Sequence, residues 1–297
     1  MIREYALLGL LAGLWGSSYL FAKVALEGIP PLTLAAFRVT VAALLLLPFL
    51  KICKASLPRE SATWRLLFTQ SLLNSALPWS LLAWGQQYVD SGLAGVLNSS
   101  SPIFVVLITL VFLRRERVGA WPLAGALLGF AGVILTIGVD VLRDLGRDVF
   151  AQLAILLSAM LYATAAIHSK KLGGVAAPVT AATTSALAAA CLLPVALVVE
   201  RPWTLEPSVR ALIAACALAI FSTAIALLVY FRLLRTLGPM GATSQSYLRA
   251  GFSVLLGMLV LGERISPAVG IGLTAIIFGV AAINRGKGKN VDSVKTT

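Results

Sequence analysis

The sequence predicts an all-α integral membrane protein with ten transmembrane helices, arranged as a 5+5 inverted-topology repeat with both termini in the cytoplasm. Of its 297 residues, 59% are hydrophobic and only 12% are charged, and the mean hydropathy is +0.93. The apolar residues gather in runs of about 20, the length of a membrane-spanning helix. Soluble domains are about 25% charged, so this composition excludes a soluble enzyme, and its apolar content excludes a disordered chain.

Short connections marked by Pro, Gly or clustered charge separate the expected spans. Backbone groups inside a bilayer must bond to each other, and spans of this length do so as helices, since barrel strands are about half as long. The first span is too long for a signal-peptide core, and we expect it to be retained. The spans cover residues 5–25, 32–50, 65–87, 91–113, 119–139, 149–170, 178–199, 209–234, 239–261 and 266–284.

Lys and Arg residues are distributed unequally between the two sides of the membrane. With the N-terminus placed inside, sixteen fall on inner segments and six on outer segments, while Arg38 and Arg249 lie within spans. Cytoplasmic loops retain Lys and Arg, so the bias places both termini in the cytoplasm. The net charge of +12 is therefore a topology signal. We expect the lipid bilayer and no nucleic acid as a partner, and the plasma membrane as the location.

The chain matches itself at an offset of 147 residues. The matches include Lys, Pro, Gly and Glu-Arg pairs, which chance rarely repeats: Lys23 with Lys170, Pro31 with Pro178, Glu116-Arg117 with Glu263-Arg264, and Gly132 with Gly279. We divide the chain into a first unit (1–147), a second unit (148–285) and a basic cytoplasmic tail (286–297). An odd number of helices in each unit inverts the second. Inverted repeats are typical of carriers that alternate access around a midplane site.

These residues resemble the EamA family of the drug/metabolite transporter superfamily. The resemblance rests on Trp15-Gly16 followed by Lys23, on Arg38, and on the two Glu-Arg pairs, and it covers residues 5–285. It implies ten helices, cytoplasmic termini and export of small metabolites, and within the family the chain looks most like bacterial exporters of amino acids, including aromatic ones. One departure is that Arg249 stands where the first unit has Pro102.

Two prolines predict broken helices that line a cavity. Proline removes a backbone donor and clashes with the carbonyl four residues earlier, so Pro78 and Pro102 are expected to free the carbonyls of Asn74 and Asn98. Such carbonyls at membrane depth must face protein or a wet cavity. We assign Asn74, Asn98 and Ser101 to the substrate site, with Pro78 and Pro102 as hinges. The alternative is that these polar groups only join helices.

The second unit carries a matching polar patch. Gln245 and Tyr247 align with the Asn98 region, and Arg249 lies too deep in its helix to reach the membrane surface easily. No Asp or Glu lies in the middle of any span, so Arg249 is expected to bind either a substrate carboxylate or freed carbonyls. Arg38 is nearer its helix end and is expected to reach the surface or form a structural pair.

Aromatic residues complete the expected site. Trp15 and Tyr162 occupy matching positions in the two units, and with Trp79 and Tyr247 they are expected to form cavity walls or to pack in the core. We expect no catalytic residue, no metal site and no cofactor, because the single histidine, His168, has no ligand or acid–base cluster around it. The chain is expected not to be an enzyme.

The expected function is export of amino acids by alternating access. Coupling ions are usually carried by embedded Asp or Glu, so their absence favours facilitated diffusion or exchange. Export of drugs or other small metabolites is one alternative, and a channel is the alternative of another class. Ten helices suffice for a carrier, and we expect a monomer or a weak homodimer.

Overall fold

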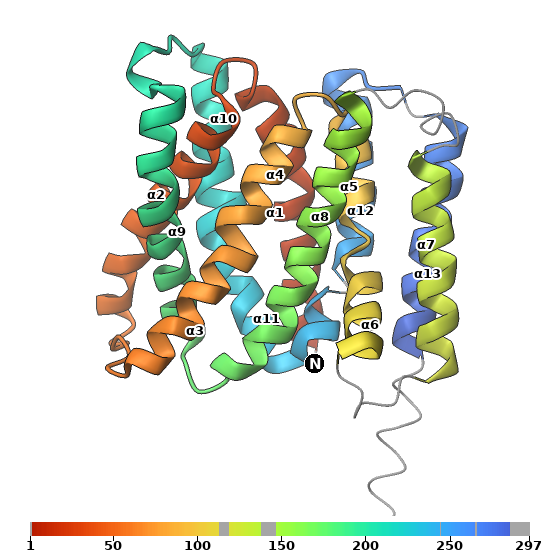
Figure 1. The fold of residues 1–297 in the computed structure, drawn as a ribbon, viewed down its shortest axis with the longest axis horizontal. Helices are drawn as coiled ribbons and strands as arrows, with labels where there is room; N and C mark the ends of the chain where they lie inside the picture. The colour runs from red at the N-terminus through yellow and green to blue at the C-terminus, as the bar shows by residue number, and fades with distance from the viewer. Residues whose placement is uncertain (1, 113–118, 138–146, 244, 265, 286–297) are drawn as a thin grey trace, which may run out of the picture.

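The computed structural model describes residues 2–112, 119–137, 147–243, 245–264 and 266–285, and within these ranges the secondary structure is helical throughout. Figure 1 shows the helices running roughly side by side in one bundle. The elements in chain order are α1 (Ile2–Ala25), α2 (Pro31–Ile52), α3 (Ser61–Ser71), η1 (Leu72–Ala76), α4 (Leu77–Gly85), α5 (Ser91–Asn98), α6 (Ser101–Phe112), α7 (Ala120–Ile137), α8 (Arg147–His168), η3 (Ser169–Leu172), α9 (Ala177–Glu200), η4 (Pro202–Thr204), α10 (Val209–Ala219), η5 (Ile220–Ile225), α11 (Ala226–Thr243), α12 (Ser246–Leu261) and α13 (Pro267–Arg285).

The bundle has two ends, because successive helical runs cross it in opposite directions (Figure 1). We call the end at which α1 begins the N-terminal face and the opposite end the distal face. α2 begins at the distal face, where Pro31 occupies the first helical turn and loses no hydrogen bond there. The carboxylate of Glu200, at the end of α9, accepts hydrogen bonds from the backbone N–H groups of Leu32 and Thr33 and joins the two helices.

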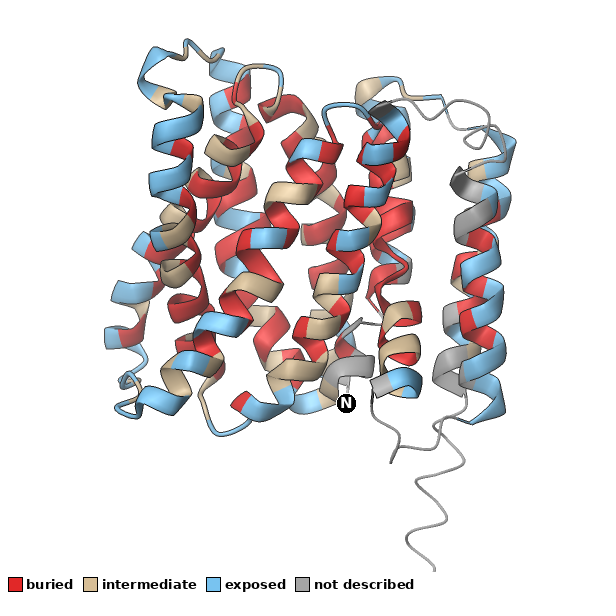
Figure 2. Cartoon of the chain, viewed as in Figure 1, coloured by how far each residue is buried: buried red, intermediate tan, exposed pale blue. Residues whose placement is uncertain are grey.

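The outer surface of the bundle is apolar, unlike the surface of a soluble protein. Polar residues such as Gln70 and Asn98 are buried, whereas Leu44, Val198 and Leu259 on the outside are 68%, 75% and 73% exposed. Figure 2 shows exposed residues along the outer helix faces and buried ones along the inner faces. Large apolar patches are rare on soluble proteins, so this surface faces lipid.

Length and composition agree with that conclusion. Within the described residues, six helical runs are long and apolar enough to cross a membrane, and three further apolar helices are shorter. The six runs are 3–25, 31–52, 91–111, 148–172, 177–200 and 209–238, and the shorter helices cover 123–132, 248–261 and 267–279. The prediction of a helical membrane protein is therefore confirmed.

Two helix pairs make the most extensive contacts, α7 with α13 and α2 with α9. Glycines allow the first approach. A Cβ on Gly279 would lie 2.5 Å from the carbonyl oxygen of Gly125 and 2.6 Å from the backbone nitrogen of Gly129, and one on Gly132 would lie 2.7 Å from the carbonyl oxygen of Gly272. These glycines thus allow α7 and α13 to pack closely within one chain.

The helices are interrupted at three places near the middle of the bundle. A π-helical turn, η1, precedes Pro78, and its Leu77 N–H donates to the Leu72 carbonyl five residues earlier. A second π turn, η5, lies between α10 and α11. The third break is at Ser99 and Ser100, where α5 ends and α6 begins. π turns recur at functional sites because they redirect the helix and its side chains.

The helical run from Ala226 to Thr243 consists of two segments that meet at a kink. The span expected over 239–261 begins directly after this kink, and α12 follows from Ser246. Gly238 makes the kink. Its backbone is non-helical, with φ 71° and ψ 175°, a conformation that glycine adopts readily. The expected boundary between the two spans therefore coincides with this kink.

Candidate functional site

A small cavity lies between α1, α2, α4, α8 and α12. Its volume is about 20 Å³, enough for one water molecule and too small for a metabolite. The lining combines two arginines with aromatic rings: Trp15, Ser18, Tyr19, Arg38, Trp79, Leu82, Tyr162 and Arg249. Among the described lining residues there is no Asp or Glu. The chemistry of this cavity is therefore cationic and aromatic.

Arg249 is held by the break between α5 and α6. Its Nη2 donates to the carbonyl oxygen of Asn98 at 3.0 Å, with longer contacts of 3.4 Å to Asn98 Oδ1 and Ser246 Oγ. That carbonyl lies four residues before Pro102, which has no N–H to donate to it, and Ser101 Oγ also donates to it at 2.9 Å. The guanidinium therefore occupies the place of a missing helical donor.

Part of Arg249 remains available. Its Nε is buried without a hydrogen-bond partner among the described residues, and its guanidinium carbon lies 5.9 Å from the centre of the Trp15 ring. Trp15 is fixed in turn, because its Nε1–H donates to the carbonyl oxygen of Ser222 in η5 at 3.1 Å and its ring lies 4.9 Å from that of Tyr230. The π turn of the second half thus positions an aromatic wall of the cavity.

Arg38 is the second cation of the cavity, and of its two expected roles it takes the structural pair and not the reach to the membrane surface. It is buried, with 6% exposed, and its guanidinium carbon lies 3.9 Å from the centre of the Trp79 ring. Its Nε–H donates to Thr223 Oγ1 at 3.0 Å. Cation–π stacking on Trp79 and a hydrogen bond from η5 favour the buried conformation over extension to the helix end.

Of the expected site residues whose side chains the structure describes, four line the cavity. Trp15, Trp79, Tyr162 and Arg249 line it. Asn98 and Ser101 lie at the break between α5 and α6, outside the lining. The Asn98 carbonyl accepts hydrogen bonds from Arg249 Nη2 and from Ser101 Oγ. Asn74, Gln245, Pro78 and Pro102 are buried outside the lining. The Asn74 Nδ2 lies 3.5 Å from Ser75 Oγ, and the Tyr247 side chain lies outside the described residues.

The lining residues that sequence reasoning missed are Ser18, Tyr19, Arg38 and Leu82. Helical spacing was the available signal for three of them. Ser18 and Tyr19 follow Trp15 by three and four residues, and Leu82 follows Trp79 by three, so each shares a helix face with an expected site residue. For Arg38 no such signal exists, because only the packing of α2 against α4 and η5 brings it to the cavity.

Hydrogen bonds close the distal end of the bundle above the cavity. Lys23 Nζ donates to the carbonyl oxygens of Gln86 and Val89, 2.9 Å from each, at the point where α4 ends and its carbonyls lack helical partners. Gln86 Nε2 donates to the carbonyl oxygen of Tyr19 at 3.0 Å. Because Tyr19 lines the cavity, this contact lies directly beside it. The three bonds tie α1 to the end of α4.

Glu263 makes a second closure at the same end. Its carboxylate accepts hydrogen bonds from the backbone N–H groups of Ser91 at 2.8 Å and Gly92 at 2.9 Å. These are unpaired donors of the first turn of α5, where a negative charge is favoured. Gly257 provides the space, since a Cβ there would collide with Glu263 Oε2. These two hydrogen bonds hold the segment after α12 against the start of α5.

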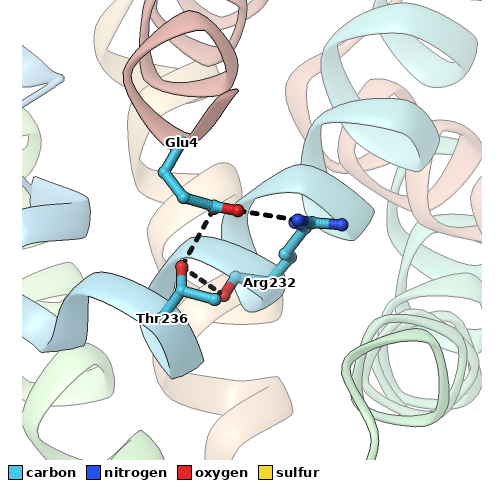
Figure 3. A network of polar contacts seen from close by, with 3 residues as sticks. All are labelled: Glu4, Arg232 and Thr236. Carbon is cyan, nitrogen blue, oxygen red and sulfur yellow. Dashed lines mark hydrogen bonds and ion pairs between the residues drawn. The ribbon is translucent and has the colours of Figure 1, made fainter. Parts of the chain in front are cut away.

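The N-terminal face has hollows and a different link. Two hollows of about 290 and 680 Å³ lie there and share no lining residue with the central cavity; Lys170 and Arg235 line the first, and Lys54 and Lys171 the second. Figure 3 shows Glu4 of α1 between Arg232 and Thr236 of α11. The Arg232 Nη2 is 2.7 Å and the Thr236 Oγ1 is 3.0 Å from the Glu4 carboxylate.

Comparison with known proteins shows a match over nearly the whole chain. A family model described as "EamA-like transporter family" matches residues 3–138 and 149–285. The "Uncharacterized inner membrane transporter YedA" of Escherichia coli K12 is 28% identical over 283 residues, covering 92% of this chain and 88% of that protein. "Protein PagO" of Salmonella typhimurium is 24% identical over 271 residues, covering 90% and 88%.

One solved structure gives the same fold. It is described as "Crystal structure of protein", superposes with a TM-score of 0.69 at 22% identity, and covers 94% of this chain and 97% of its own. At this identity the likeness concerns the fold alone. The described helices are therefore arranged as in a known protein.

Proposed function

The chain belongs to the EamA-like transporter family, and on this premise we propose that it exports amino acids, aromatic or apolar ones in particular, by alternating access. The family and the names of the relatives make it a non-enzymatic, multi-pass transporter of the plasma membrane within the drug/metabolite transporter superfamily. The family suggests small metabolites as the transported class. The amino-acid substrate and the mechanism are the proposal.

The observation that carries the substrate proposal is the cavity with Arg249 and aromatic walls. Guanidinium groups bind carboxylates through paired hydrogen bonds, and Arg249 has an Nε without a partner among the described residues. Trp15, Trp79 and Tyr162 line the same cavity and offer apolar surface to a side chain. An aromatic or apolar amino acid has both a carboxylate for Arg249 and an apolar side chain for the aromatic rings.

Correspondence between the halves supports the inverted repeat. Adding 147 to the residues of η1 gives 219–223, which overlaps η5 at Ile220–Ile225. The paired helices α2 and α9, and α7 and α13, are also the pairs that this offset relates. We propose that the two units of five helices exchange conformations about the cavity, with the N-terminal face in the cytoplasm.

Under this assignment the structure is an occluded conformation. The distal face, placed outside, is closed by Lys23 and Glu263, and the N-terminal face carries the hollows. The cavity of about 20 Å³ must enlarge to admit an amino acid. Opening toward the outside therefore requires that the hydrogen bonds of Lys23 and Glu263 break.

Counterflow in liposomes tests the proposed function. Purified full-length chain is reconstituted in vesicles loaded with unlabelled phenylalanine or leucine, and uptake of the labelled amino acid is followed. We expect saturable uptake that internal substrate accelerates. A channel would show no such acceleration, and absence of any amino-acid movement, with uptake of other metabolites instead, would overturn the amino-acid assignment.

The outer closure gives a first prediction about a single residue. Glu263→Gln keeps the shape of the side chain but removes the charge from the first turn of α5 and one of the two acceptors. That charge is worth about 1 kcal/mol, so we expect the outside-open conformation to become about fivefold more populated. A cysteine at Ser18, in a chain lacking its three native cysteines, should react about fivefold faster with an impermeant maleimide applied outside.

Glu27→Gln is the matched control for this variant. Glu27 also lies at the distal face, but its ion pair with Arg210 is 3.9 Å long and both side chains are more than half exposed. Its loss is expected to leave the labelling rate unchanged, because exposed pairs contribute little. Equal labelling rates for the wild type and the Glu263 variant would contradict a closing role for Glu263.

A further inference from the structure

The cavity carries two positive charges, whereas the carboxylate of one amino acid supplies a single negative charge. Arg38 and Arg249 both line the cavity, and neither forms an ion pair within the described residues. Within the described part of the chain, every Asp and Glu lies at or near the end of a helix or in a connection. Two buried cations without an acid are costly unless a mobile anion joins them.

Both guanidinium groups keep donors for such an anion. Among the described residues, Arg38 has one hydrogen-bond partner, Thr223 on its Nε–H, which leaves its two terminal amino groups without one. Trp79 packs against this group, with its ring centre 3.9 Å from the guanidinium carbon, and both residues line the cavity. Arg249 is bonded through Nη2 alone, with its Nε unpaired.

An ammonium group finds poor conditions in the same place. The carbonyl oxygen of Asn98 already accepts from Arg249 and Ser101, and the described lining holds no carboxylate. Any ammonium group within this cavity also lies close to two guanidinium groups, which repel it strongly at low dielectric. The carboxylate of an amino acid is thus recognised, whereas its ammonium group is only tolerated.

We propose that Arg38 and Arg249 together form an anion site, and that the protein transports small organic carboxylates without an ammonium group, such as aryl-alkanoic and 2-oxo acids, at least as readily as amino acids. This inference rests on the proposed function for the transport step but not for binding. Each such substrate carries one negative charge across the membrane, whereas a zwitterionic amino acid carries none.

Three ligands that share a phenyl ring and a two-carbon linker test the anion site. They are phenylalanine, 3-phenylpropionate, which lacks the ammonium group, and phenethylamine, which lacks the carboxylate. Binding to the purified full-length protein is followed through tryptophan fluorescence, since Trp15 and Trp79 line the cavity. We expect 3-phenylpropionate to bind at least as tightly as phenylalanine, and phenethylamine about ten- to a hundredfold more weakly, the usual effect of losing hydrogen bonds to a charged group.

Transport gives the second readout. In proteoliposomes at pH 7.5, a valinomycin-set potassium gradient should change the rate of 3-phenylpropionate exit and leave phenylalanine exit unchanged, with protein-free liposomes correcting for passive leakage. Transport of phenylalanine without binding or transport of 3-phenylpropionate would overturn the anion site and leave the proposed function standing. Carboxylate-selective binding without transport of any of the three would retain the anion site and refute the proposed function.

Arg38 variants separate binding from folding. Arg38→Gln is expected to weaken 3-phenylpropionate binding about tenfold or more, whereas Arg38→Lys restores part of it through the charge. Thr223→Val removes the hydrogen bond to Arg38 while keeping both cations, so it should preserve the preference for carboxylates over phenethylamine. Phenethylamine binding as tightly as 3-phenylpropionate to the wild type, or unchanged carboxylate binding in Arg38→Gln, would refute the proposal.

Discussion

Arg249→Gln is expected to lower the transport rate at least a hundredfold and to lower stability as well. The substitution removes the cation that we assign to the substrate carboxylate. It also shortens the donor that reaches the Asn98 carbonyl, a buried acceptor that no backbone N–H replaces because of Pro102. Ser101 Oγ still donates to this carbonyl, but the lost hydrogen bond came from a charged donor and such bonds contribute about 1.5–3 kcal/mol. Thermal unfolding in detergent measures this loss alongside counterflow.

Two comparisons interpret that result. Arg249→Lys keeps the charge but loses the fork of donors, and we expect it to retain a small part of the transport rate. Arg210→Gln removes an exposed arginine at the distal face and should change neither stability nor transport. Wild-type transport by Arg249→Gln would mean that Arg249 only fastens the break between α5 and α6.

Gly279→Leu is expected to separate α7 from α13 and to lower the free energy of unfolding by about 3 kcal/mol or more. The added atoms would meet the backbone of Gly125 and Gly129 at 2.5–2.8 Å, and backbone cannot turn aside as a side chain can. The hydrophobic effect contributes little to helix association inside a membrane, so close packing supplies much of the stability of the contact between α7 and α13. Thermal unfolding in detergent measures the loss.

Gly270→Leu is the control on the same helix. No atom lies within 4 Å of a Cβ built there, so the variant adds apolar surface on the lipid side without a collision. We expect its melting temperature to match that of the wild type. Equal stability of the two leucine variants would contradict the view that glycine contacts hold α7 against α13.

Much of the fold and part of the site were predictable from the sequence. The helical membrane class follows from the length and hydropathy of each segment, and the family from short motifs such as Trp15-Gly16. At the site, Trp15, Trp79, Tyr162 and Arg249 were identified because each is unusual within an apolar span. Asn74 and Gln245 were unusual in the same way, yet they lie outside the cavity lining. Residue type alone does not distinguish a residue that lines a cavity from a polar residue buried between packed helices.

The remaining features depend on contacts between distant segments. The position of Arg38 beside Trp79 requires α2 to pack against α4, and the orientation of Trp15 requires the π turn η5 of the other half. Likewise, Glu263 was recognised as part of a repeated Glu-Arg pair, but its partners Ser91 and Gly92 became known only from the structure. No local pattern encodes such partners.

The sequence by itself determined that this chain crosses a membrane and belongs among helical transporters, because the cost of transferring a segment into lipid depends on that segment's own composition and length. Only the tertiary structure decided that Arg38 joins Arg249 in one cavity among the described residues, and that the Asn98 carbonyl is bound by a guanidinium. A buried charge is stabilised by whichever groups surround it, and those groups come from helices far apart in the chain.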